Sequence, residues 1–79
     1  MKHLFEIIQE KSGYWRVYTK QYFVLDTKFA DEIIKNYEKD CGLYCDNHFD
    51  TEHEAELFLT NYVEPYVLMK KLSGELWIP

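Results

Sequence analysis

The chain has 79 residues, a formal net charge of −5, 47% hydrophobic residues and 18% aromatic residues. This length allows one domain only, spanning residues 1–79, and the apolar content excludes a disordered tail. The negative charge excludes a basic footprint for nucleic acid, and no apolar run has the length of a signal peptide or a membrane-spanning helix. We therefore expect a single folded domain in the cytoplasm.

The first patterned segment is a β-hairpin in which residues 3–10 and 14–19 flank the loop Lys11-Ser12-Gly13. A three-residue loop whose glycine adopts the left-handed conformation is a common hairpin closure. A two-residue loop at Ser12-Gly13 would mix apolar and charged side chains on both faces, so the longer loop is favoured. One face then holds the apolar side chains of Phe5, Ile7, Trp15 and Val17.

The other face of this hairpin carries polar and aromatic side chains, namely those of Glu6, Glu10, Tyr14, Arg16 and Tyr18. One interpretation is a solvated sheet face on which arginine and glutamate pair across the strands. A second interpretation is a contact patch, because tyrosine and arginine are enriched among the residues that dominate binding energy at interfaces. Tyr14, Arg16 and Tyr18 are therefore candidate partner-binding residues.

A first helix is predicted over residues 27–39, with Asp26 or Thr27 as its N-cap and Gly42 as a left-handed C-cap. Its apolar stripe recurs with helical spacing and comprises Phe29, Ala30, Ile33, Ile34 and Tyr37. The outward face mixes both signs of charge and includes Asp31 and Lys35 at i, i+4. This is an ordinary solvated face, and we assign it no function.

A strand over residues 43–49 leads into the helix with the clearest signals, which begins at Thr51 and ends before Pro65. Thr51 is a good N-cap, and Glu54 three residues later can close a capping box. A single amphipathic stripe follows, formed by Ala55, Phe58, Leu59, Tyr62 and Val63. Pro65 ends the helix in this prediction, because its ring disfavours helical geometry in the preceding residue.

The chain closes with a second predicted hairpin, in which residues 66–72 and 75–78 flank Ser73-Gly74. Its outer face would bring Lys70 and Trp77 together as a cation–π pair. The predicted order of elements is β-β-α-β-α-β-β. Because each helix has one apolar stripe, we expect an α+β fold in which both helices pack on one face of a small, mainly antiparallel sheet.

From residue 40 to residue 69 the chain has seven carboxylates and no Lys or Arg. Solubility is one explanation, because charged runs are usually solvated faces and early carboxylates stabilise a helix through its dipole. The other explanation is a binding surface around an outward-pointing leucine. Its candidate residues are Asp46, Asp50, Glu52, Glu54, Glu56, Leu57 and Glu64.

Cys41, Cys45, His48 and His53 have zinc-binding chemistry, but we expect no metal site. Their spacing lacks the long separation between ligand pairs that lets a zinc site close, and Cys45 and His48 would point to opposite faces of a strand. The sequence holds no catalytic motif and no phosphate-binding glycine loop. Its solvated acids also lack a pocket that would raise their pKa values. We therefore expect neither an enzyme nor a cofactor.

These observations favour a non-enzymatic binding protein whose acidic face docks on a basic surface of another protein, without direct contact to nucleic acid or membrane. If that basic surface normally holds nucleic acid, the carboxylates would stand in for phosphates, and the chain would be an inhibitor. The alternative is a structural domain that self-associates as a homodimer through its aromatic hairpins, with Tyr14, Tyr18 and Trp77 exposed at the contact.

In size, acidity and lack of a catalytic motif, the chain resembles small phage-encoded antagonists of host defence or host transcription, of which anti-CRISPR proteins are one group. The resemblance is one of overall character and carries over no residue. It implies a viral or mobile-element protein that acts as an inhibitor in the host cytoplasm.

Overall fold

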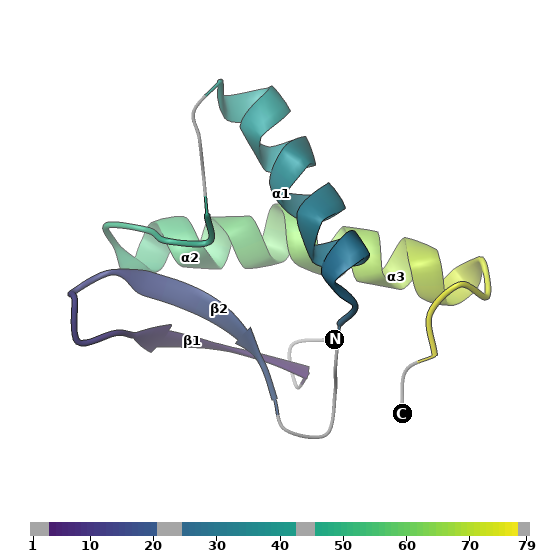
Figure 1. Ribbon diagram of the computed structural model, residues 1–79, viewed down its shortest axis with the longest axis horizontal. Helices are drawn as coiled ribbons and strands as arrows, with labels where there is room; N and C mark the ends of the chain where they lie inside the picture. Colours follow the sequence, from purple (N-terminus) through teal and green to yellow (C-terminus); the bar gives the residue numbers. More distant parts are fainter. Residues whose placement is uncertain (1–3, 21–24, 43–45, 78–79) are drawn as a thin grey trace.

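A computed structural model describes residues 4–20, 25–42 and 46–77. Two strands come first, β1 (Phe5–Gln9) and β2 (Trp15–Thr19), followed by the helix α1 (Thr27–Cys41). The helix α2 (Glu52–Phe58), the π-turn η2 (Leu59–Val63) and the helix α3 (Glu64–Leu72) then follow without a break. In Figure 1 these last three elements form one rod, with the hairpin lying along its α2 half and α1 crossing it steeply.

The predicted hairpin and its register are confirmed. The antiparallel pairs run from Phe5 opposite Thr19, through Ile7 opposite Val17, to Gln9 opposite Trp15. The loop is the three-residue one, because the Glu10 N–H donates to the Tyr14 carbonyl at 2.8 Å. Gly13 has a φ of 95°, a conformation that glycine adopts without the steric cost of a side chain.

The strand predicted over residues 43–49 is wrong for its described part. Residues 46–48 are irregular, and Phe49 makes only an isolated antiparallel bridge to Trp15, with reciprocal N–H···O distances of 2.8 and 2.9 Å. The physical reason is Asn47, whose φ of 58° cannot continue a strand. Leu43, Tyr44 and Cys45 lie outside the described residues.

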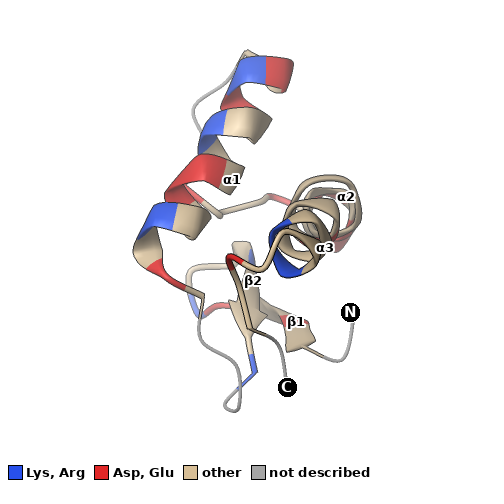
Figure 2. Ribbon diagram, turned by 90° about the vertical axis from the view of Figure 1, so that its right-hand side faces the viewer, with Lys and Arg blue, Asp and Glu red and all other residues tan. Residues whose placement is uncertain are grey.

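The first helix is confirmed, and α1 extends two residues beyond the predicted end. Gly42 is its left-handed C-cap, with a φ of 70° and an N–H that donates to the Glu38 carbonyl at 2.8 Å. Phe29 and Ile33 are buried and the rest of the predicted stripe is half-buried. Figure 2 shows basic and acidic residues interleaved along this helix, as expected for a solvated face.

The next helix begins as predicted but does not end at Pro65. Thr51 is its N-cap, and the Thr51 hydroxyl accepts from the Glu54 N–H at 3.2 Å. The π-helical turn η2 comes directly before the turn that contains the proline: the Glu64 N–H donates to the carbonyl of Leu59, five residues back. This wider register precedes Pro65 and accommodates both its missing N–H and the ring that would clash in a regular helix.

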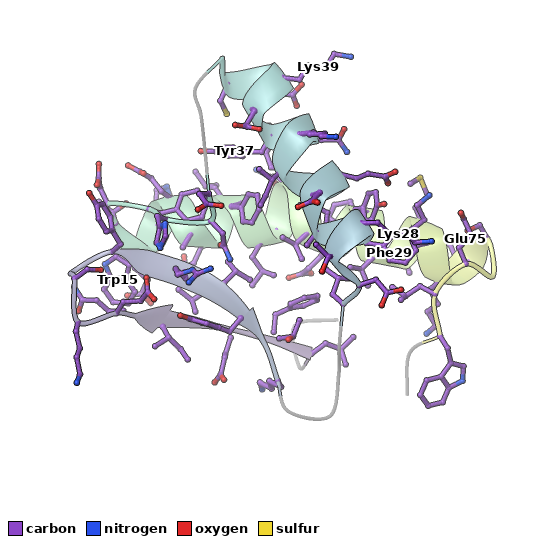
Figure 3. All side chains as sticks on the ribbon, in the orientation of Figure 1. Trp15, Lys28, Phe29, Tyr37, Lys39 and Glu75 are labelled. Atoms are coloured by element: carbon purple, nitrogen blue, oxygen red, sulfur yellow. The ribbon has the colours of Figure 1, made fainter. Side chains whose placement is uncertain are left out.

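Tyr37 of α1 lies at the centre of an aromatic cluster that joins α1 to the rod. Its ring centroid is 5.8 Å from that of Phe49, 5.2 Å from that of Phe58 and 5.1 Å from that of Tyr62. Figure 3 shows Tyr37 projecting from the middle of α1. The Tyr62 hydroxyl donates to Asp40 at 3.0 Å, and this bond, together with burial, raises the pKa of Tyr62 to about 12. All five residues of the stripe predicted after Thr51 are buried or half-buried.

The predicted closing hairpin is absent from residues 66–77, because residues 66–72 belong to α3 and residues 73–77 are irregular. Tyr66 packs edge-on against Phe29 at 6.1 Å, and its hydroxyl donates to Glu32. Burial, followed by this hydrogen bond, raises the pKa of Tyr66. The neighbouring residues Tyr66 and Val67 are both buried, which fits one face of a helix and not the alternation of a strand.

The predicted pairing of Lys70 with Trp77 is also wrong. Lys70 lies over the rings of Phe29 and Tyr66 and forms an ion pair with Glu75 at 3.2 Å, while Trp77 is 80% exposed. Figure 3 shows Lys28 and Phe29, from the start of α1, near Glu75. These contacts join the start of α1 to α3.

The α+β class therefore holds, but its finer description does not. The described residues contain one two-stranded antiparallel sheet, in place of the expected five strands. The core is a single cluster in which the hairpin contributes Leu4, Phe5 and Val17, and the helices contribute most of the remainder. Both strands make their main helix contacts with α2, whereas α1 makes its main contacts with η2, so the predicted arrangement of two helices on one sheet is not matched.

Candidate protein-binding groove

Three glutamates line an open groove between β1 and α2. The groove has a volume of about 410 Å³. Its lining residues are Phe5, Glu6, Ile7, Glu52, Glu56, Leu59 and Thr60. No Lys or Arg of the described residues lines it, and none forms an ion pair with Glu6, Glu52 or Glu56. The groove, which we call the acidic groove, is therefore lined by three acidic residues that no positive charge of the described residues offsets.

Local structure explains how these three residues come to line one groove. Glu52 and Glu56 are four residues apart on α2, so they lie on the same side of the helix, about one turn apart. The buried side chains Ala55 and Phe58 hold α2 against the hairpin. Glu6 lies between the buried Phe5 and the half-buried Ile7 on the strand beside α2, and its exposed side chain alternates to the face opposite theirs, at the border of the groove. The acidic groove is thus a consequence of how α2 packs on the hairpin.

The remaining acidic candidates lie outside this groove. Asp46, Asp50 and Glu54 are exposed but do not line it, and Leu57 is 45% exposed on another side of α2. Glu64, a candidate for an exposed binding surface, is half-buried: its Oε1 atom is buried and accepts no hydrogen bond from the described residues. Glu64 follows the buried Val63 and lies one turn before the buried Val67, which explains this burial.

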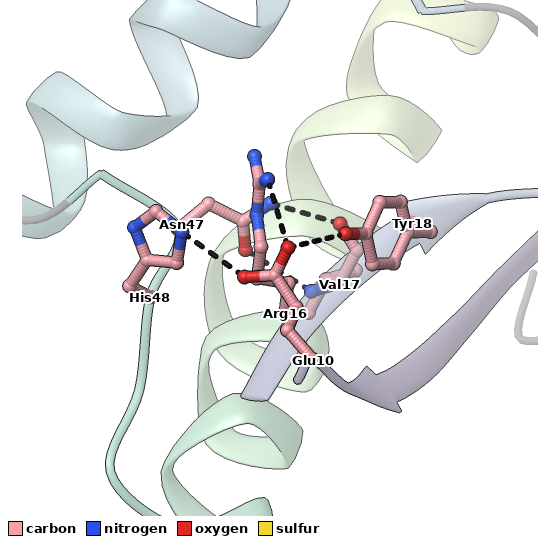
Figure 4. A network of polar contacts seen from close by, with 6 residues as sticks. All are labelled: Glu10, Arg16, Val17, Tyr18, Asn47 and His48. Atoms are coloured by element: carbon pink, nitrogen blue, oxygen red, sulfur yellow. Dashed lines mark hydrogen bonds and ion pairs between the residues drawn. The ribbon is translucent and has the colours of Figure 1, made fainter. Parts of the chain in front are cut away.

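Glu10 is the centre of a network of polar contacts on the outer face of the hairpin. Its Oε2 accepts from the Tyr18 hydroxyl at 2.9 Å and lies 3.5 Å from Arg16 Nη1, while its Oε1 lies 3.2 Å from His48 Nε2. Figure 4 shows these contacts together with those of Asn47 and Val17. Burial acts to raise the pKa of Glu10, but the Tyr18 hydrogen bond and the Arg16 charge outweigh it and lower this pKa.

The contacts of Glu10 bear on the two interpretations of the outer hairpin face, which are cross-strand pairing and a contact patch. Arg16 and Tyr18 are half-buried and already engaged with Glu10, and the Arg16 guanidinium lies 5.3 Å from the centre of the Tyr18 ring. Tyr14 is 47% exposed and contacts the His48 ring at 5.6 Å. The contacts support a structural role for Arg16 and Tyr18 and leave Tyr14 the most accessible of the three.

Among the residues with zinc-binding chemistry, Cys41, His48 and His53 are described and exposed, whereas Cys45 lies outside the described residues. Within residues 4–20, 25–42 and 46–77, no group of three or more His, Cys, Asp or Glu side chains could hold a metal ion. His48 instead contacts Glu10 and Tyr14.

Sequence reasoning missed the part that Glu6 plays in the groove. The acidic run begins at residue 40, and nothing in local spacing connects Glu6 to it. Only the packing of β1 beside α2 brings Glu6 to Glu52 and Glu56. The only sequence feature that sets Glu6 apart is its place directly after Phe5 on a short predicted strand.

Comparison of the chain with protein-family models, with curated proteins and with solved structures found no match. In the part of the chain that the structure describes, no helix is both long enough and apolar enough to cross a membrane.

Proposed function

We propose that the chain is a non-enzymatic protein-binding module whose acidic groove docks on a basic surface of another protein. The observation that carries this proposal is that Glu6, Glu52 and Glu56 line one groove, whereas no basic side chain of the described residues lines it. Uncompensated carboxylates attract a basic partner over several ångströms and set the register in which it docks. Leu59 and Ile7 supply apolar surface in the same groove.

An inhibitory action would follow if the basic surface of the partner normally holds nucleic acid. The groove carboxylates would then occupy positions that phosphates otherwise take, and the chain would compete with the nucleic acid without binding it. Such competition is the action expected of a phage or mobile-element antagonist. It is measured by adding the chain to a complex of the identified partner with labelled nucleic acid and following the release of the label.

Comparative capture tests the binding proposal. The immobilised chain is exposed to cytosolic extract, and retained proteins are identified by mass spectrometry for the wild type and two double variants. E52Q/E56Q removes two charges from the groove, whereas D50N/E54Q removes two charges outside it, so net charge is matched. We expect a basic protein to be retained by the wild type and by D50N/E54Q, released by salt, and lost from E52Q/E56Q. Equal retention by both variants would contradict the proposal.

Self-association is a second candidate, favoured by exposed apolar side chains at the end of α3. Leu68 is 44% exposed, Met69 54% and Leu72 78%, and Trp77 follows them at 80%. Of the two aromatic hairpins expected at a homodimer contact, the closing one is absent from residues 66–77, so we place the contact at these exposed side chains. Sedimentation at low and high salt tests it. An apolar dimer should persist at high salt and dissociate in the Leu72→Asp variant, and a monomer at all concentrations would exclude it.

A further inference from the structure

The backbone of β1 has one side bonded to β2 and one side turned outward. The Glu10 N–H donates to the Tyr14 carbonyl at 2.8 Å, and the Lys20 N–H donates to the Leu4 carbonyl at 2.9 Å. Because bonded and non-bonded pairs alternate in an antiparallel ladder, Glu6 and Ile8 bond to β2. Ile7 and Gln9 therefore direct their N–H and C=O groups away from β2.

The two edges of the hairpin differ in how these outward groups are satisfied. On β2, Trp15 pairs with Phe49, and Val17 exchanges hydrogen bonds with the Asn47 side chain at 3.1 and 2.8 Å. On β1, no hydrogen bond within residues 4–20, 25–42 and 46–77 reaches the outward backbone groups of Ile7 or Gln9. Such an edge is a template on which another extended chain can pair.

This open edge borders the acidic groove, because Ile7 lines the groove together with Glu6, Glu52 and Glu56. We propose that the partner contributes an extended basic segment that adds as a third strand along β1. Backbone hydrogen bonds to Ile7 and Gln9 would hold the segment, and the groove carboxylates would select its basic side chains. The inference rests on the proposed function, since it assigns how a basic partner occupies the same groove.

The spacing of the carboxylates fits a strand in this place. Figure 1 shows α2 lying along the hairpin, and α2 contacts both strands. Glu52 and Glu56 are separated by about 6 Å along the helix axis, given a rise of about 1.5 Å per residue. Alternate side chains of a strand are separated by about 6.8 Å and point to the same face. Basic side chains at alternate positions of the added segment therefore match the two glutamates.

Charge also decides between a basic partner and a second copy of this chain. Pairing of two β1 edges would bring the Glu6, Glu52 and Glu56 carboxylates of one copy close to those of the other. Like charges placed together across an interface oppose association. A basic segment meets the same backbone edge with the opposite charge, so it is the occupant that the groove fits.

Amide hydrogen exchange followed by NMR on the full chain tests the proposal. The probe is a short peptide of alternating lysine and valine, and the control peptide has glutamate in place of lysine. When the lysine peptide is present at about ten times its Kd, about a tenth of the chain remains free. The Ile7 and Gln9 amides should then exchange roughly tenfold more slowly than in the chain without peptide. The Glu6 and Ile8 amides, already bonded to β2, are the internal reference, and the glutamate peptide should have no effect.

Two outcomes would overturn strand addition, and they differ in what they say of the proposed function. If the lysine peptide shifts the Glu52 and Glu56 resonances while Ile7 and Gln9 exchange at the free rate, the groove binds basic chains without strand pairing. The proposed function then stands and the inference fails. If the lysine peptide produces neither effect, strand addition by a basic segment is wrong, and the capture comparison decides the proposed function on its own.

A matched pair of variants gives a second test that does not depend on exchange rates. Gln9→Pro removes an N–H that faces away from β2, whereas Gln9→Ala keeps this N–H and removes only the side chain, whose Nε2 donates to the Gly13 carbonyl at 3.2 Å. Proline is tolerated on an edge strand at such a position, so both variants should fold. Binding of the lysine peptide should weaken several-fold in Gln9→Pro only. Equal affinity of both variants would contradict strand addition.

Discussion

The side-chain amide of Asn47 occupies the place of a neighbouring strand beside Val17. The Val17 N–H donates to Asn47 Oδ1 at 3.1 Å, and Asn47 Nδ2 donates to the Val17 carbonyl at 2.8 Å (Figure 4). A primary amide presents the same donor and acceptor as a peptide group, which is why one side chain can satisfy both backbone groups. The outer edge of β2 is therefore closed by a side chain here and by the Phe49 bridge two residues away.

Asn47→Gly should destabilise the fold by about 1–3 kcal/mol, because half-buried backbone groups of Val17 lose both partners. Glycine adopts the φ of 58° at position 47 without strain, so the loss reports the amide contacts and not the backbone. Urea denaturation of both proteins measures the difference. An unchanged midpoint would show that water replaces the amide at no cost.

Asn47→Asp should be less stable than the wild type at neutral pH, because a carboxylate oxygen would face the Val17 carbonyl in place of the Nδ2 donor. Such a group has a raised pKa in the folded state, so the lost stability should return as the pH falls and the protonated acid donates to the carbonyl. Denaturation at neutral and acidic pH tests this sign. A variant that loses further stability in acid, relative to the wild type, would contradict it.

Phe58→Ala should destabilise the fold by about 3–5 kcal/mol, because it leaves a cavity beneath α2. Phe58 is 3% exposed and its ring contacts those of Phe49 and Tyr37 at 5.1 and 5.2 Å. Leu57→Ala is the matched control from the same helix, and it should change stability little because Leu57 is 45% exposed. Similar urea midpoints for the two variants would show that the buried stripe is assigned to the wrong side of α2.

Stability in acid should depend on Glu10. Its pKa is lowered in the folded state, so its contribution is present above the ordinary glutamate pKa of about 4.3 and is lost as the pH falls below that value. Glu10→Gln should reduce the slope of unfolding free energy against pH in that range. Tyr18→Phe, which removes the hydrogen bond to Glu10 and keeps the carboxylate, should reduce it in part. If both variants keep the wild-type slope of unfolding free energy against pH, Glu10 is not the source of this pH dependence.

Local signals sufficed for the first half of the fold. Gly13 and the alternation on either side of it predicted the hairpin register, and Gly42 predicted the end of α1 to within two residues. These features depend on neighbours in sequence, so they can be recognised without knowledge of the tertiary structure. The closure of the β2 edge by Asn47 could not be recognised in this way, because it joins residues 30 positions apart.

The prediction fails after residue 65, because a proline usually ends a helix, whereas here α3 continues through Pro65 to Leu72. The helical period was present: Val63, Tyr66 and Val67 are buried and Lys70 is half-buried, at i, i+3, i+4 and i+7. A π-helical turn that lets a helix continue through a following proline has no distinct sequence signal. The sequence predicted an acidic face that includes Glu52 and Glu56 but no groove, because Glu6 joins the groove only through the packing of β1 beside α2.

The most direct test of the central claim is the association rate of the captured basic partner, measured by stopped flow at low and high salt. E52Q/E56Q should associate more slowly than the wild type, with a smaller dependence on salt, because it lacks two of the charges that steer the encounter. D50N/E54Q carries the same net charge and should slow association less, since neither residue lines the acidic groove. If the two variants associate at the same rate, net charge alone governs the encounter, and the acidic groove is not the binding site.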